Sequence, residues 1–92
     1  MISFKSSIQI PDSIYFQQID DEAVLLEANS GKYFGLNPVG ARAWALLTEG
    51  RTLEEAYQTI LEEYEVEADR LQADLLKLFE TLVEKGLLLV IV

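Results

Sequence analysis

The spacing of apolar residues changes at Asn37, and this change divides the chain into a strand-forming part and a helix-forming part. Apolar and polar residues alternate before it, whereas apolar residues recur three and four positions apart after it. Asn37 is a favourable N-cap, and Pro38 suits the first position of a helix because a free N–H is not needed there. A run of strands followed by a run of helices is typical of an α+β domain.

The first part of the chain is predicted to form an antiparallel meander. Alternation predicts three strands, over residues 14–19, 23–28 and 32–36. Turns are predicted at residues 20–22 and 29–31, and Gly31 supplies the positive φ that such a hairpin favours. Val24, Leu26 and Ala28 share one face of the second strand, and Phe34 and Leu36 share one face of the third, opposite Tyr33. Residues 1–13 alternate only weakly and are predicted to be an N-terminal arm or an extra edge strand.

The second part is predicted to form three helices. They cover residues 38–48, residues 53–64 and a long segment that follows the connection 65–69 and ends at residue 85. Gly50 and Gly86 follow the first and third helices, and Thr52 and Glu55 form a capping box for the second. Residues 87–92, LLLVIV, are predicted to be a short strand or an extended tail. The whole pattern predicts one winged helix-turn-helix-like domain over residues 1–92.

The charge of the chain limits its partners. Sixteen acidic residues against seven basic ones give a net charge of -9. A surface this acidic repels nucleic-acid phosphates and anionic lipids. Neither a nucleic acid nor a membrane is therefore expected as a partner. It suits a cationic peptide or a basic patch on another protein, or it only keeps the domain soluble. A signal peptide and a membrane-spanning stretch are both missing, which favours a cytoplasmic protein.

The residue types disfavour catalysis. The chain has no histidine and no cysteine, so it lacks the commonest general base and two frequent metal ligands. The paired acids Glu54–Glu55 and Glu62–Glu63 lie on predicted helices, where neighbouring side chains point apart. A glycine-rich phosphate loop and an Asp-x-Asp metal loop are also missing. We therefore predict no enzymatic activity, no cofactor and no metal site.

A binding site is predicted where the third strand meets the third helix. At 100° per residue, the apolar residues from Ala68 to Val83 cover an arc of roughly 160°, although a helix packed on one side needs roughly 100°. The surplus is either covered by the N-terminal arm or the C-terminal tail, or it forms the wall of a groove. Residues 32–36 form an edge strand with little protection, and Gly35 lets another backbone approach. This combination favours the addition of a peptide strand.

Residues Gly31–Leu47 follow the pattern G-x-Y-F-x-L-N-P-x-G-x-x-A-W-x-L-L and resemble the PqqD-like family. The run EGRTLEEA, Glu49–Ala56, and the closing Leu78, Leu82 and Lys85–Leu88 extend the resemblance. It implies a RiPP recognition element, which binds the leader of a ribosomally made precursor peptide that is later modified. Free-standing members of this length resemble the leader-binding subunit of lasso peptide biosynthesis, which passes the precursor to a leader peptidase. Other members serve radical-SAM enzymes.

The resemblance also implies the site residues, because the leader of such proteins adds to the third strand and packs against the third helix. The docking strand it implies consists of Lys32, Tyr33, Phe34, Gly35 and Leu36. For the helix wall we predict Arg70, Leu71, Asp74, Leu75 and Leu78, because charged Arg70 and Asp74 flank leucines on that margin. The opposite helix margin, Gln72, Leu76 and Val83, stays open as an alternative, and Trp44 falls at a core position of the family. The predicted function is a non-catalytic adaptor that delivers a leader to a leader peptidase or another peptide-modifying enzyme. The alternatives are a chaperone for a radical-SAM enzyme, a transcription regulator and a partner-stabilised structural subunit.

Overall fold

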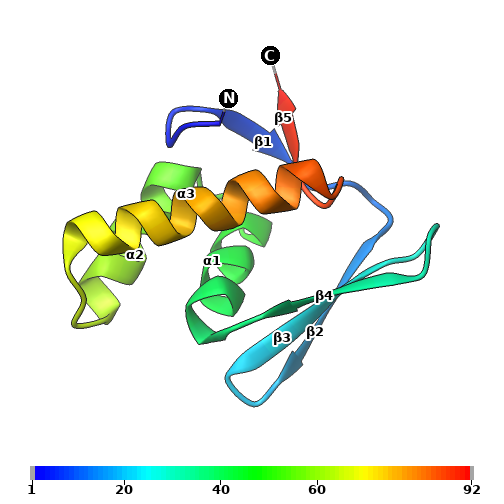
Figure 1. Cartoon of the computed structure of the whole chain (residues 1–92), viewed down its shortest axis with the longest axis horizontal. Coiled ribbons are helices and arrows are strands. Elements are labelled where there is room, and N and C mark those ends of the chain that lie inside the picture. Colours follow the sequence, from blue (N-terminus) through cyan, green and yellow to red (C-terminus); the bar gives the residue numbers. More distant parts are fainter. Residues whose placement is uncertain (1, 92) are drawn as a thin grey trace.

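The computed structural model describes residues 2–91, so Met1 and Val92, the ends of the predicted arm and tail, lie outside the described residues. Over residues 2–91 the chain forms five strands and three helices, in the order β1 Ser7–Gln9, β2 Ile14–Ile19, β3 Glu22–Glu27, β4 Lys32–Leu36, α1 Pro38–Thr48, α2 Leu53–Glu63, α3 Ala68–Glu84 and β5 Leu89–Ile91. The predicted α+β class, with a three-stranded sheet before three helices, is confirmed. Figure 1 shows this sheet below α3 and beside α1.

The main sheet is the predicted antiparallel meander, in the order β2-β3-β4. In this register Leu25 faces Phe34, and Ala23 faces Leu36. One detail of the prediction is corrected: β3 buries Ala23 and Leu25 rather than the face that carries Val24. Both faces of β3 are apolar in sequence, and the packing of α1 against the sheet decides which one enters the core.

Side chains at the first turns of α1 and α2 fix where these helices begin. The Asn37 side-chain oxygen accepts a hydrogen bond of 2.8 Å from the Gly40 N–H. Thr52 and Glu55 form the predicted capping box, with bonds of 2.9 and 3.0 Å. Gly86 follows α3 with φ at 76°, a left-handed conformation that glycine adopts without strain. The boundaries predicted from these residues agree with the structure to within one or two positions.

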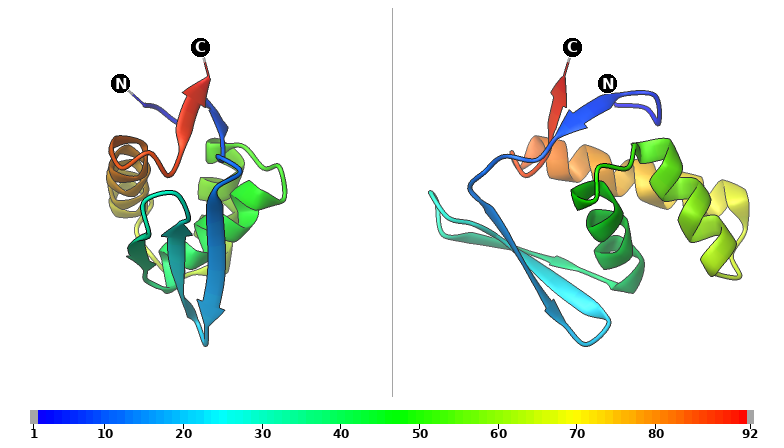
Figure 2. Two further views of the ribbon diagram at one scale, coloured as in Figure 1. Left: turned by 90° about the vertical axis from the view of Figure 1, so that its right-hand side faces the viewer. Right: turned by 180° about the vertical axis from the view of Figure 1, so that it is seen from behind.

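The core lies where the three helices and the inner face of the sheet meet. Its largest fully buried side chains come from α1, α2, α3, β3 and the segment after α3, and are Trp44, Phe79, Leu25, Leu46, Leu53, Ile60, Leu75, Leu82 and Leu88. Within residues 2–91 no polar or charged side chain is classed as buried. The view from behind in Figure 2 shows α1 between the sheet and α2, so α1 links the strands to α2, which packs in turn against α3.

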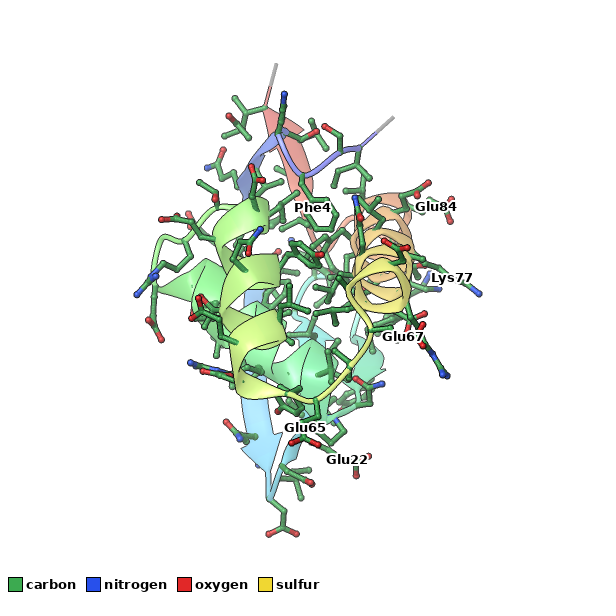
Figure 3. The ribbon with its side chains drawn as sticks, turned by 90° about the vertical axis from the view of Figure 1, so that its left-hand side faces the viewer. Phe4, Glu22, Glu65, Glu67, Lys77 and Glu84 are labelled. Carbon is green, nitrogen blue, oxygen red and sulfur yellow. The ribbon has the colours of Figure 1, made fainter. Side chains whose placement is uncertain are left out.

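The arm and the tail form a second sheet, because β1 pairs with β5 in antiparallel register, with Ile8 opposite Val90. This small sheet lies on the other side of α3 from β4 (Figure 1). Phe4, before β1, places its ring 5.0 Å from that of Tyr57 and edge-on to Phe79 at 6.4 Å. Figure 3 shows Phe4 directed between α2 and α3. The arm therefore covers part of the wide apolar face of α3.

Candidate peptide-binding groove

An open groove with a volume of about 890 Å³ lies between β4, the start of α1 and α3. Residues from four parts of the fold line it, namely Phe34, Gly35 and Leu36 of β4, Asn37, Val39 and Gly40 at the start of α1, Glu65, Val66 and Glu67 before α3, and Arg70, Leu71, Asp74, Leu75 and Leu78 of α3. A groove of this size is large enough to accept several side chains of a ligand.

The structure brings most of the predicted site residues together. Phe34, Gly35 and Leu36 line the groove from β4, and all five predicted residues of α3 line it from the other side. Lys32 and Tyr33 are outside the lining: Lys32 begins β4, and the Tyr33 side chain is 74% exposed on the outer side of the sheet. The alternative helix margin, Gln72, Leu76 and Val83, does not contribute to this groove.

The edge of β4 is open along the groove. In the part of the chain that the structure describes, β4 pairs with β3 alone. Alternate residues of an antiparallel edge strand direct their N–H and C=O groups away from the sheet, where they are available to another strand. A Cβ atom added to Gly35 would have no other atom within 4 Å. Gly35 therefore leaves open space beside the strand.

The helix residues of the groove differ in exposure, and this separates their roles. Leu71 and Leu75 are only 4% and 1% exposed, so they belong to the core and form the floor of the groove. Leu78 is partly buried and packs at the margin of the core, so part of its side chain faces the groove. The apolar arc of α3 is thus shared: the arm covers the side near Phe79, and the side near Leu78 opens to the groove.

Sequence analysis missed the contribution of α1 and of the loop before α3. Val39 is partly buried at one wall, and Val66 is 43% exposed at the rim. A Cβ atom on Gly40 would lie 3.2 Å from Asn37 Oδ1, 3.3 Å from Leu36 Cδ2 and 3.4 Å from Leu78 Cδ2. Gly40 therefore allows the first turn of α1 to approach both walls. In the sequence, Asn37 and Pro38 just before Gly40 indicated the start of a helix. They gave no indication that Gly40 lies close to Leu36 and Leu78.

Three carboxyl groups with a lowered pKa hold the framework outside the groove. The pKa of Glu27 is lowered chiefly because the Ser13 hydroxyl donates a hydrogen bond of 2.6 Å to it. The backbone N–H of Thr52 lowers the pKa of Glu55 within the capping box. Arg42 donates two hydrogen bonds, of 2.9 and 2.7 Å, to Glu63, which lowers the pKa of Glu63 and raises that of Arg42. The first bond joins Ser13, just before β2, to the end of β3, the second caps α2, and the last two join α1 to α2.

The groove lining combines apolar side chains with four charged ones, Glu65, Glu67, Arg70 and Asp74. Among residues 2–91 there is no group of three or more side chains placed to hold a metal ion. Over the same residues, every buried polar atom of a side chain has a hydrogen-bond partner. No helix in this range is long and apolar enough to cross a membrane. What the groove presents to a ligand is an unpaired strand edge next to an apolar wall.

Comparison with known proteins identifies the family. Residues 22–88 match the family described as coenzyme PQQ synthesis protein D (PqqD). The chain belongs to the PqqD family. The resemblance drawn from residues 31–88 is therefore confirmed, and the matched range of this PqqD-family chain includes every residue that lines the groove. No curated protein matches the chain.

Two solved structures are similar to this PqqD-family chain over most of its length. One is "TbiB1 in Complex with the TbiA(beta) Leader Peptide", with 42% sequence identity and a TM-score of 0.80, covering 87% of this chain and 93% of that chain. The other is "Lasso peptide synthetase B1 complexed with the leader peptide", with 32% identity and a TM-score of 0.78, covering 89% of this chain and 96% of that chain. Both of those proteins were solved with a leader peptide bound.

Proposed function

We propose that this chain binds the leader of a ribosomally made precursor peptide by adding it as a strand to β4. The observation that carries the proposal is that the open edge of β4 and the groove of about 890 Å³ lie side by side in the same PqqD-family fold. The similar structures with leader peptides support the choice of ligand. Main-chain hydrogen bonds to β4 would supply affinity, and the groove would select side chains.

The dimensions of β4 indicate how much of a leader would be held. Five residues, Lys32–Leu36, form the strand. An extended chain rises roughly 3.3 Å per residue and points alternate side chains to the same face. A peptide of similar length would therefore direct two or three side chains toward Leu78 and Phe34. The groove walls are apolar at these positions, so apolar or aromatic side chains are the expected occupants.

The chain would act as an adaptor without catalysis of its own. The groove lining contains no histidine or cysteine, and the described residues include no group placed to hold a metal ion, which supports this role. Both similar solved structures are leader complexes, and the second belongs to a lasso peptide synthetase. These matches favour delivery to a leader peptidase over delivery to a radical-SAM enzyme. Purified chain is expected to leave a precursor peptide intact and to accelerate its cleavage when the peptidase is added.

The binding mode is tested by NMR titration of isotope-labelled protein with the TbiA(β) leader peptide. We expect backbone amide shifts at residues 32–36 and along the groove side of α3, with little change on the outer side of α2. A peptide of the same composition in scrambled order serves as the control. If neither this leader nor the leader of the second similar complex shifts any amide of β4, the proposed strand addition is wrong.

A further inference from the structure

The groove is acidic at one end. Glu65 and Glu67 line it just before α3 begins, and Asp74 follows in the second turn of α3, with Arg70 as the one basic residue of the lining. Glu22 belongs to the same end, because its neighbour Ala23 pairs with Leu36, the last residue of β4. Figure 3 views the molecule from this end, and Glu22, Glu65 and Glu67 are labelled there.

The other end carries two lysines. Lys32 begins β4, and Lys85 caps α3 with its Nζ atom 6.0 Å from the centre of the Phe34 ring. Two acidic residues are near these lysines in the fold. Glu27 pairs with Lys32 across the hairpin, and the hydrogen bonds from Ser13 and Ser30 favour the charged form of its carboxylate. Glu84 precedes Lys85, and successive helical residues point about 100° apart. Each lysine therefore has an acidic residue beside it, and this end of the groove is close to neutral.

The stability of α3 explains only part of the arrangement of charged residues along the groove. Acidic residues near the start of a helix and basic residues near its end interact favourably with the helix dipole, which fits Glu67 and Lys85. Glu22 and Lys32 belong to strands, so the dipole of α3 gives no reason for their positions. Acidic residues of separate elements thus gather at one end of the groove, whereas the other end is close to neutral.

The direction of the added strand determines which part of the leader lies at the acidic end of the groove. The sheet is antiparallel throughout, and antiparallel pairing is slightly more stable per residue than parallel pairing. β4 runs from Lys32 toward the acidic end, so an antiparallel peptide enters at the acidic end and leaves past Lys32 and Lys85. We propose, building on the function proposed above, that the groove selects leaders with basic residues before the docked segment.

Two modified forms of the TbiA(β) leader test this polarity. One form carries three lysines at its N-terminus, and the other carries three lysines at its C-terminus, each joined through the same glycine-serine spacer. At about 20 mM salt the N-terminal form is expected to bind about threefold to tenfold more tightly than the C-terminal form, because a few exposed ion pairs separate them. The difference is expected to shrink at about 500 mM salt, where the charges are screened.

A pair of protein variants with equal net charge assigns the effect to the groove. Glu65→Gln combined with Glu67→Gln is expected to remove most of the preference for the N-terminal form. Glu54→Gln combined with Glu80→Gln removes the same charge from exposed positions outside the groove. This second variant is expected to retain the preference for the N-terminal form. Circular dichroism and thermal unfolding establish that both variants are folded.

The outcomes separate this proposal from the function on which it rests. Equal affinity for both lysine forms, or tighter binding of the C-terminal form, overturns the charge polarity while leader binding stands. A preference that survives in the Glu65→Gln, Glu67→Gln variant also overturns it. If neither leader named above binds in any form, the proposed function fails and the polarity fails with it.

Discussion

Replacing Leu78 with alanine separates binding from folding, because Leu78 is the groove residue of α3 that combines apolar contact with partial exposure. A fully buried leucine costs about 3 kcal/mol or more of unfolding free energy when it is cut to alanine. Leu75, at 1% exposure, is such a residue. Leu78 keeps part of its side chain in contact with solvent in the free protein, so Leu78→Ala is expected to cost about 1 kcal/mol.

The effect of Leu78→Ala on affinity is expected to exceed its effect on folding. A docked side chain would cover the exposed part of Leu78, and truncation of a residue at the centre of an interface costs about 1–2 kcal/mol. The dissociation constant of the TbiA(β) leader is then expected to rise roughly fivefold to thirtyfold. Isothermal titration calorimetry measures this constant, and urea unfolding followed by the fluorescence of Trp44, the sole tryptophan, measures stability.

Leu75→Ala is the matched comparison, three positions away on the same helix. It is expected to lower the urea midpoint strongly, and to affect the affinity of the remaining folded protein less than Leu78→Ala does. A folded Leu78→Ala protein with the affinity of the original chain would exclude this helix margin from the binding site. If the amides of residues 32–36 also stayed unshifted in that titration, the error would lie in strand addition itself.

Two further predictions concern the framework of the fold. Asn37→Ala removes the acceptor of the 2.8 Å bond from the Gly40 N–H and is expected to cost about 1 kcal/mol in urea unfolding, whereas an unchanged midpoint would mean that water replaces the cap. The lowered pKa values of Glu27, Glu55 and Glu63 favour the folded state above their ordinary value of 4.5, so the urea midpoint is expected to fall as the pH drops below it. Glu27→Gln should make this fall smaller, and a midpoint independent of pH would contradict the assignment.

The order and type of the main elements could be predicted from sequence because local features determine them. Asn37 and Pro38 mark the start of α1, Thr52 and Glu55 that of α2, and Gly86 follows the end of α3. These features act through hydrogen bonds and backbone angles of nearby residues. The sequence around each boundary therefore contains the information that positions it.

The features that sequence analysis missed depend on residues far apart in the chain. The pairing of Ile8 with Val90 joins two short apolar segments, and neither segment contains a pattern that names the other as its partner. The buried face of β3 is another example, because Val24 and Leu25 are both apolar and the packing of α1 selects Leu25. The edge of β4 was predictable from the meander, but the contribution of Val39 and Val66 to the groove required the three-dimensional arrangement.

The β1–β5 sheet determines where another protein can be attached. It brings the first and last strands together on the other side of α3 from β4 (Figure 1). An enzyme joined to either end would therefore leave the edge of β4 uncovered. A short flexible tether between two such modules raises the effective concentration of one near the other into the millimolar range, by the usual order-of-magnitude estimate. A fused enzyme would then be held near a docked peptide by the tether. A weak affinity between enzyme and peptide would therefore be sufficient for the two to associate.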